Sequence, residues 1–148
     1  MANINGCELP EDLYYLIEKH VWAKPLDGNI IRIGMTSVAA KLSGGSLNAV
    51  TVSNRKIGKE LAQGKSVATV ESSKFVGPVP APISGTLLRG NDNVIDDPSL
   101  AISDPYGEGW IAEMEATDWD SEKGSLATGS DGLDTYRKAI EEAGISCK

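Results

Sequence analysis

The sequence predicts a small, mainly β domain, a sandwich or barrel with short helices and one C-terminal helix. Short apolar and β-branched runs recur over residues 9–117, with clusters of Gly, Asn, Asp and Pro between them. Many short strands separated by turn residues are typical of sandwiches and barrels. Near the C-terminus the apolar residues follow a helical spacing, which predicts an amphipathic helix. These residues are Leu133, Tyr136, Ile140 and Ala143.

Each expected strand is an apolar run bounded by turn residues. The expected strands cover 13–17, 19–23, 30–34, 47–52, 67–70, 86–89 and 110–115. The Asp-Gly pair at 27–28 lies between two apolar runs and is a hairpin signal. Thr36 or Ser37 can cap a short helix over 38–42, since either hydroxyl can accept a hydrogen bond from an N–H of the first turn.

The chain of 148 residues suits one domain with one core. We expect a loose N-terminal arm over 1–8 and the β domain over 9–117. A stretch rich in Ser, Gly, Asp and Thr predicts a linker over 118–132. The C-terminal helix and tail, 133–148, are expected to pack on the domain, with Gly144 ending the helix.

Composition excludes several function classes. The net charge of -7 argues against binding to nucleic acid and is compatible with docking on basic partner surfaces. No apolar run approaches the roughly 20 residues that span a bilayer, and no signal peptide is recognisable, so no membrane association is expected. Cys7 and Cys147 lie at opposite ends and form no disulfide framework or zinc spacing. We expect both to be mobile thiols in a cytoplasmic protein.

The stretch 67–85 reads V-A-T-V-E-S-S-K-F-V-G-P-V-P-A-P-I-S-G. Its β-branched start favours a strand, its serines favour a turn, and its prolines favour an extended return. This pattern predicts a hairpin with Lys74 at the tip. A single amine on a rigid hairpin is a good substrate for covalent modification.

Several motifs in order resemble known families. Lys74, flanked by Gly64 and Gly85, resembles the attachment site of lipoyl and biotinyl carrier domains. Over roughly 9–115 the chain resembles the glycine cleavage H-protein family. The motifs that carry this resemblance are L-P-E-D-L-Y-Y at 9–15, H-V-W at 20–22, E-S-S-K at 71–74, A-P-I-S-G at 81–85 and D-P-Y-G-E-G-W at 104–110.

The resemblance implies a barrel-sandwich hybrid fold and a lipoyl group in amide linkage to Lys74. It places the other candidate site residues in the attachment loop, which comprises Glu71, Ser72, Ser73 and Phe75, and in flanking turns at Gly64 and Gly85. Such a protein is a carrier rather than an enzyme, and a lipoate-attaching ligase is an implied partner. A monomer suits a shuttle.

Other residues favour structural interpretations. His20 lies beside Trp22 in an apolar run, so a half-buried structural histidine is expected there rather than a catalytic base. Glu71 is expected to shape the turn or to be read by the ligase. No nucleophile with a base, metal cluster or phosphate-binding loop is recognisable, so no catalytic residue or metal is predicted.

The cargo is predicted from departures from the family pattern. In the family that the chain resembles, three positions supply acidic and hydroxyl groups that receive an aminomethyl cargo. Here these positions hold Lys19, Val21 and Pro78. These are poor hosts for a buried ammonium, which needs a partner. The departures resemble H-like lipoate-binding proteins of the sulfur-oxidising, heterodisulfide-reductase-like pathway.

We therefore expect a carrier of sulfur-containing intermediates that serves a heterodisulfide-reductase-like enzyme complex. One alternative is an aminomethyl carrier for the glycine cleavage P, T and L enzymes. The other is an interaction module without lipoate. Exchange of Cys7 or Cys147 with the lipoyl dithiolane is a further alternative to cysteines without a role.

Overall fold

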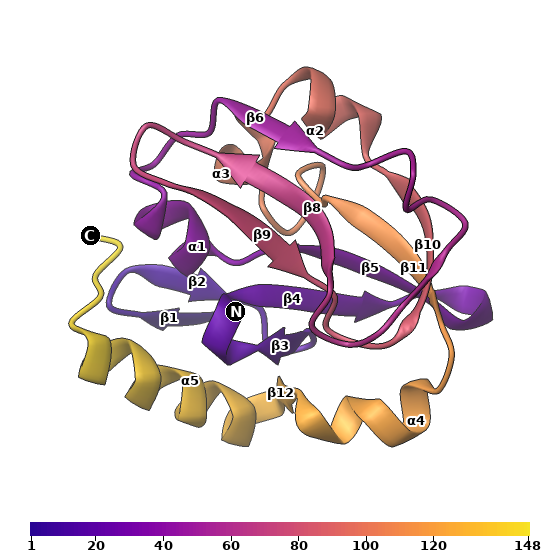
Figure 1. The fold of residues 1–148 in the computed structure, drawn as a ribbon. Coiled ribbons are helices and arrows are strands. Elements are labelled where there is room, and N and C mark those ends of the chain that lie inside the picture. Colours follow the sequence, from indigo (N-terminus) through magenta and orange to yellow (C-terminus); the bar gives the residue numbers. More distant parts are fainter.

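A computed structural model describes residues 1–148 and shows three antiparallel sheets with short helices and a long C-terminal helix (Figure 1). The largest sheet has seven strands in the order β12-β3-β4-β5-β11-β10-β7. In chain order these strands are β3 (Tyr14–Leu16), β4 (Val21–Pro25), β5 (Ile30–Met35), β7 (Glu60–Leu61), β10 (Gly85–Gly90), β11 (Ala112–Ala116) and β12 (Ala127–Thr128). The mainly β prediction is confirmed.

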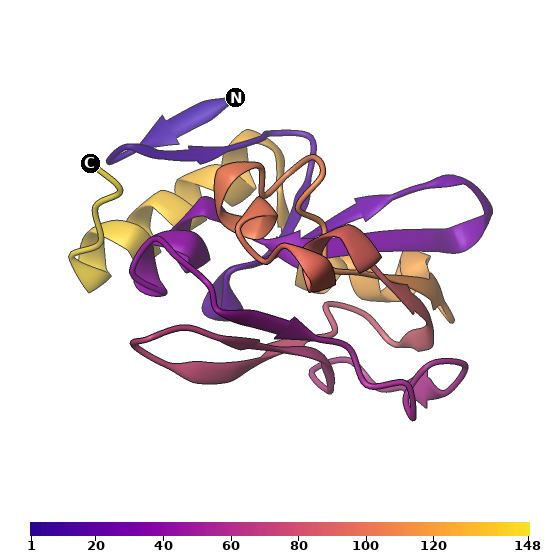
Figure 2. The same cartoon turned by 90° about the horizontal axis from the view of Figure 1, so that it is seen from above.

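Two smaller sheets complete the β structure. The sheet that carries the attachment stretch has the order β6-β8-β9. Its strands are β6 (Ala49–Thr51), β8 (Ser66–Glu71) and β9 (Val76–Pro80). The second pairs β1 (Ala2–Ile4) with β2 (Cys7–Leu9). Figure 2 shows the three-stranded sheet along one side of the molecule, with the N-terminal hairpin and the C-terminal helix on the opposite side.

The helices are short except for the last. They are α1 (Ser37–Leu42), α2 (Asp92–Asp96), α3 (Leu100–Ser103), α4 (Trp119–Glu122) and α5 (Gly129–Ala143), with 3₁₀ turns η1 (Ile17–Lys19), η2 (Asp27–Asn29) and η3 (Lys123–Ser125). Thr36 is the cap of α1, because its Oγ1 accepts a hydrogen bond from the N–H of Ala39 at 3.3 Å. None of the helices combines the length and apolar character that a bilayer crossing requires.

The main core lies between the seven-stranded and three-stranded sheets. It is a cluster of 23 buried residues drawn from both, including Ile33 on β5, Val70 on β8 and Met114 on β11. Buried and exposed residues alternate around Val70 of β8. Thr69 and Glu71 beside it are exposed, so one face of the strand packs inward and the other meets water.

A second core attaches α5 to the domain. Leu133, Tyr136 and Ile140 of α5 are buried in a cluster that also contains Trp22 of β4. The helix ends at Gly144, whose φ of +67° favours glycine. The packed C-terminal helix is therefore confirmed, although it begins at Gly129, before the predicted boundary.

The N-terminal arm and the C-terminal tail differ from the prediction. Residues 1–8 were expected to be loose, yet they form most of a hairpin, and a disulfide joins Cys7 to Cys147. Cys7 is fully buried, and the N–H of Cys147 donates to the carbonyl of Asn5 at 2.9 Å. The expectation of mobile thiols is wrong, because the fold brings together two ends that are 140 residues apart.

The predicted linker is also ordered. Residues 118–132 hold α4, η3, β12 and the start of α5. Their polar side chains make specific contacts. Asp118 caps α4 by accepting from the N–H of Ser121 at 3.3 Å, and Glu122 accepts two hydrogen bonds from Ser84 at 2.8 and 2.9 Å. Composition alone could not separate capping residues from a flexible linker.

The strand predicted over 19–23 begins only at Val21. Ile17–Lys19 form the 3₁₀ turn η1, and His20 follows with φ 56° and ψ 46°, in the left-handed region. This short turn redirects the chain before β4 begins. It also places the side chain of His20 against the hydroxyl of Tyr136 on α5.

Candidate functional site

Lys74 lies in the tight turn between β8 and β9, as predicted. Glu71 pairs with Val76 at the end of the ladder, and the N–H of Ser72 donates to the carbonyl of Phe75 at 2.8 Å. The turn projects Lys74 beyond the ends of β8 and β9 in the three-stranded sheet. The side chain of Lys74 is exposed, and its only hydrogen bond runs from its backbone N–H.

Ser72 holds this turn together. It is only 7% exposed, and its Oγ accepts from the backbone N–H groups of Lys74 and Phe75, both at 3.2 Å. A serine hydroxyl that bonds backbone groups two and three residues on is a common device in turns. Ser73 and Glu71 are exposed and Phe75 is 41% exposed. The structure thus gives Ser72 the distinct structural role among the loop candidates.

The two flanking glycines differ from each other. Gly64 has φ +91° in the turn before β8, and its N–H donates to the carbonyl of Ala81 at 2.9 Å. Gly85 was expected in a turn but is the first residue of β10, where it pairs with Leu61 and Ala116. A side chain at Gly85 would collide with the backbone of the neighbouring strand, so this position requires close approach rather than a turn.

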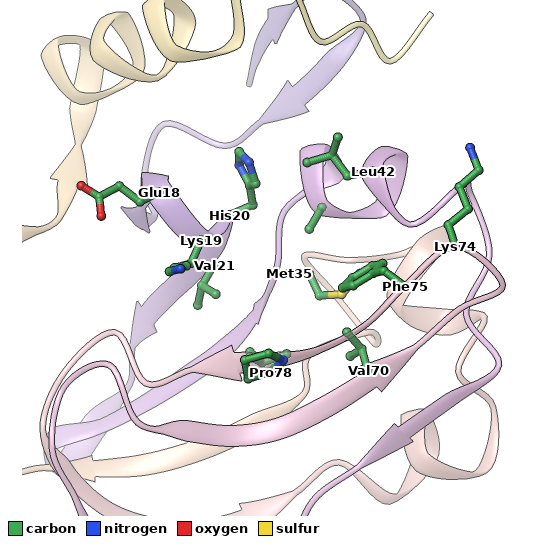
Figure 3. A pocket seen from close by; sticks show the side chains of 12 residues that line it. Glu18, Lys19, His20, Val21, Met35, Leu42, Val70, Lys74, Phe75 and Pro78 are labelled. Atoms are coloured by element: carbon green, nitrogen blue, oxygen red, sulfur yellow. The ribbon is translucent and has the colours of Figure 1, made fainter. Parts of the chain in front are cut away.

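A cleft of about 360 Å³ lies beside Lys74. Figure 3 shows its side chains, which come from η1 and β4, from β5 and α1, and from the β8–β9 hairpin. Most of the lining is apolar: Val21, Met35, Ala39, Leu42, Val70, Phe75, Pro78 and Val79. Lys74 points away from these side chains in Figure 3. The hairpin therefore combines a free amine with an adjacent apolar shelter.

Lys19, Val21 and Pro78, the positions that predicted the cargo, all line this cleft. Glu18 also lines it, and sequence reasoning missed that residue. Its carboxylate points away from the centre of the cleft in Figure 3. The centre is accordingly without an acidic group.

Gly44 is a second contact that sequence reasoning missed. It follows α1 with φ +90°, and a Cβ placed there would lie 3.1 Å from Cδ of Lys74. The stem of Lys74 therefore rests against the end of α1. Nothing in the sequence around Gly44 indicates this position beside Lys74, which is 30 residues further along the chain.

His20 is held by a buried hydrogen-bond chain. The hydroxyl of Tyr136 lies 2.7 Å from Nδ1 of His20 and 3.0 Å from Oγ1 of Thr36. Oγ1 of Thr36 also accepts from the N–H of Ala39, so His20, Tyr136 and Thr36 form one connected chain that ends at α1. Burial lowers the pKa of His20 and raises the pKa of Tyr136, so both groups are neutral.

No group of three or more His, Cys, Asp or Glu side chains in the structure could hold a metal ion. The geometry is that of a presenting hairpin, a rigid turn with a single reactive amine. Together with the sandwich architecture, it defines a carrier domain of the lipoyl and biotinyl class.

Comparison with known proteins identifies the family. The model of the glycine cleavage H-protein family matches residues 13–142. Glycine cleavage system H protein 5 of Aquifex aeolicus is 39% identical over 99% of both chains. A probable glycine cleavage system H protein 2 of Sulfurisphaera tokodaii is also 39% identical, over 100% of this chain and 99% of its own.

The crystal structure of a glycine cleavage system H protein from Mycobacterium marinum superimposes with a TM-score of 0.72 and 31% identity, over 93% of this chain and 100% of that one. The chain belongs to the glycine cleavage H-protein family. Its fold is the barrel-sandwich hybrid of lipoyl domains, as predicted. Members of this family are carriers rather than catalysts, and they hold lipoate covalently on a lysine.

Proposed function

We propose that Lys74 is the lysine that carries the lipoyl group, in amide linkage to Nζ. The observation that supports this most strongly is the exposed amine at the tip of a turn fixed by Ser72 and placed beside an apolar cleft. The residues present fit such a group, because the cleft offers apolar surface to a hydrocarbon chain. When bound, lipoate would supply a dithiolane that two successive thiol attacks reduce to the dithiol, the attacking thiols leaving as a disulfide.

The residues around Lys74 present this arm and do no chemistry on it. Ser72 fixes the direction of the turn, and Gly44 leaves room for the stem of Lys74. Tethering keeps the arm at high local concentration for successive partner enzymes. A lipoate-attaching ligase and the glycine cleavage P, T and L enzymes are the proposed partners, since the names of the relatives refer to that system.

The first test is intact mass after expression with a lipoate ligase and lipoate. We expect the mass of one lipoyl amide on the wild-type protein and none on Lys74→Arg, which keeps the charge but offers no amine to acylate. An unmodified wild-type protein under these conditions would leave only the interaction module without lipoate.

The lining of the cleft favours a second candidate for the cargo. An aminomethyl group is a cation, and a charge removed from water needs a partner. Lys19, Val21 and Pro78 supply none, and the carboxylate of Glu18 points away. An uncharged sulfur-containing intermediate needs no such partner, so transport to a heterodisulfide-reductase-like complex remains the alternative proposal.

Reconstitution separates the two cargoes. The lipoylated protein is incubated with glycine decarboxylase, glycine and pyridoxal phosphate, and the fraction loaded with methylamine is read by mass. Loading comparable to that of a glycine cleavage H protein supports the aminomethyl carrier. A rate lower by more than about tenfold, equivalent to about 1.4 kcal/mol of transition-state stabilisation, supports the sulfur carrier.

A further inference from the structure

The Cys7–Cys147 disulfide lies at the same end of the molecule as Lys74. In Figure 1 the C-terminus is on the same side of the molecule as α1 and the loop that joins β8 to β9, and in Figure 2 α1 lies between that loop and the C-terminus. The function proposed for Lys74 does not use this disulfide. The question is whether the arm can reach it.

Helix α1 connects the two features. At its first residue, the carbonyl of Ser37 is 3.8 Å from Sγ of Cys147. Just beyond its last residue, the Cβ position of Gly44 is 3.1 Å from Cδ of Lys74. Ser37 and Gly44 are seven positions apart, so at about 1.5 Å per residue these two contacts are about 10 Å apart along α1.

The length of a lipoyl chain matches this separation. With bonds of about 1.5 Å, the chain from Nζ to the sulfurs extends on the order of 9 Å beyond the amine. Nζ itself is free to turn, since the side chain of Lys74 is exposed and makes no hydrogen bond. The sulfurs of the arm can therefore reach the Ser37 end of α1.

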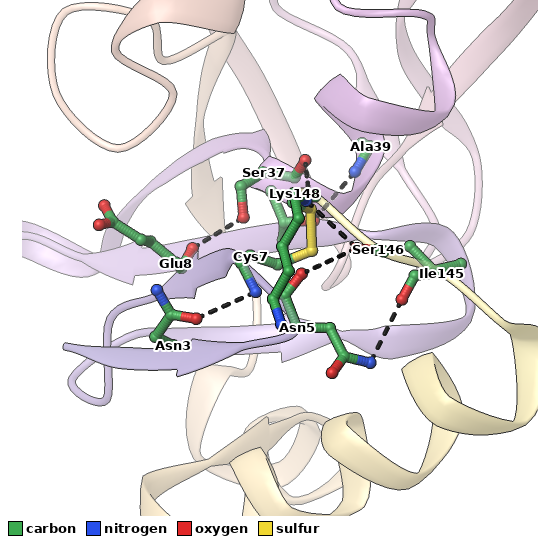
Figure 4. The surroundings of a disulfide bond; sticks show 12 residues. Asn3, Asn5, Cys7, Glu8, Ser37, Ala39, Ile145, Ser146 and Lys148 are labelled. Carbon is green, nitrogen blue, oxygen red and sulfur yellow. Dashed lines mark hydrogen bonds between the residues drawn. A yellow bond between two sulfur atoms is a disulfide. The ribbon is translucent and has the colours of Figure 1, made fainter.

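The two cysteines differ in accessibility. Cys7 is 0% exposed, whereas Cys147 is partly exposed. Figure 4 shows the sulfur–sulfur bond beneath Lys148, an exposed residue. Attack on a disulfide needs access to one sulfur. Cys147, the partly exposed member of the pair, is therefore the one open to attack, and Cys7 is the leaving group.

We propose that the Cys7–Cys147 disulfide is an internal electron acceptor for the reduced arm, an inference that rests on lipoylation of Lys74. Cys147 Sγ is attacked by one thiolate of the dithiol, the Cys7–Cys147 bond breaks, and Cys7 leaves as a thiolate that takes up a proton. Cys147 is then displaced by the second thiol. Two electrons and two protons pass to the cysteines, and the arm returns to the dithiolane.

The experiment reduces the arm and then counts thiols. Fully lipoylated protein at about 10 µM is treated with dihydrolipoamide dehydrogenase and excess NADH, quenched with N-ethylmaleimide, and analysed by intact and peptide mass. We expect adducts on Cys7 and Cys147 in addition to those on the arm. The tethered arm acts at millimolar effective concentration. These cysteine adducts should therefore appear roughly a hundredfold faster than when free dihydrolipoamide at 10 µM reduces the disulfide of Lys74→Arg.

Two variants complete the test. Lys74→Arg lacks the arm and should keep its disulfide when treated with the dehydrogenase and NADH alone. Cys7→Ser/Cys147→Ser should gain adducts on the arm only. The inference fails if the wild-type protein gains no more adducts than the double variant, or if Lys74→Arg is labelled as fast as the wild type. Absence of lipoate from the starting mass is a separate result that refutes the proposed function as well.

Discussion

Ser72 has a larger role than its neighbours in the attachment turn. Its Oγ is the acceptor for two backbone N–H groups, while Ser73 beside it is exposed and makes no side-chain hydrogen bond. Replacing Ser72 with alanine removes the acceptor of both N–H groups, whereas replacing Ser73 alters only an exposed side chain. The pair is therefore a matched test of how far turn geometry controls modification.

We expect Ser72→Ala to lower the free energy of unfolding by about 1 kcal/mol and to slow lipoylation, because the turn loses the bonds that direct Lys74. Urea unfolding and the lipoylated fraction at fixed ligase time measure the two effects. Ser73→Ala should match the wild type in both. Equal lipoylation rates for all three proteins would mean that the ligase does not depend on the turn.

His20 makes stability depend on pH. Burial lowers its pKa, so the folded protein binds fewer protons here than the unfolded chain below the ordinary histidine pKa of 6.5. This contribution to stability is complete above that pKa and is lost as pH falls through it toward the lowered value. We expect the free energy of unfolding to decrease from pH 7 to pH 5.

His20→Gln provides the control for this prediction, because glutamine cannot titrate but can still form a hydrogen bond with Tyr136. Urea unfolding at both pH values should show a smaller decrease in the variant, the remainder coming from carboxylates. An identical decrease in both proteins would contradict the assignment to His20.

At the scale of elements, the end of α1 controls the space around Lys74. Gly44 and Gly45 both have positive φ, +90° and +80°, but only at Gly44 would a Cβ meet Lys74. Either alanine substitution should cost about 1–2 kcal/mol of stability, because a Cβ is unfavourable in this region. Only Gly44→Ala should also change the lipoylation rate, measured by intact mass against Gly45→Ala. Equal lipoylation rates in the two variants would show that the space left by Gly44 does not affect the modification of Lys74.

The elements near Lys74 were predictable because their signals are local. The run Val67–Val70, the serines and the prolines define strand, turn and return in one continuous stretch, and β8 and β9 follow it. The capped helix over 38–42 is local in the same sense. Gly44 and Glu18 joined the site only through the fold, since neither is close to Lys74 in sequence.

The errors in prediction involve contacts distant in sequence. Residues 118–132 look flexible by composition, but Glu122 binds Ser84, which lies 38 positions earlier. The polar composition of a segment says nothing about such a partner. The disulfide was missed for the same reason, since two cysteines with no third or fourth give no pattern to interpret.

The disulfide affects the molecule as a whole. It closes a loop with a sequence separation of 140, and in the chain-entropy account such a long loop restricts the unfolded state strongly. The prediction of a cytoplasmic protein rested on free thiols at Cys7 and Cys147. The disulfide removes that argument, and the localisation stays a prediction.

We expect Cys7→Ser/Cys147→Ser to lower the free energy of unfolding by about 2–4 kcal/mol, measured in urea. The wild-type protein with dithiothreitol should approach the variant, while the variant should not respond to dithiothreitol. If the two proteins unfold at the same urea concentration without reductant, the disulfide contributes nothing to stability.

The link between residues 7 and 147 encloses the residues between them in a covalent ring. A protease that cuts one peptide bond anywhere inside it, for example at the exposed Arg55, leaves both fragments covalently joined. The clipped protein runs as a single band until a reducing agent is added. Gels with and without reductant are therefore both needed to judge whether a preparation is intact.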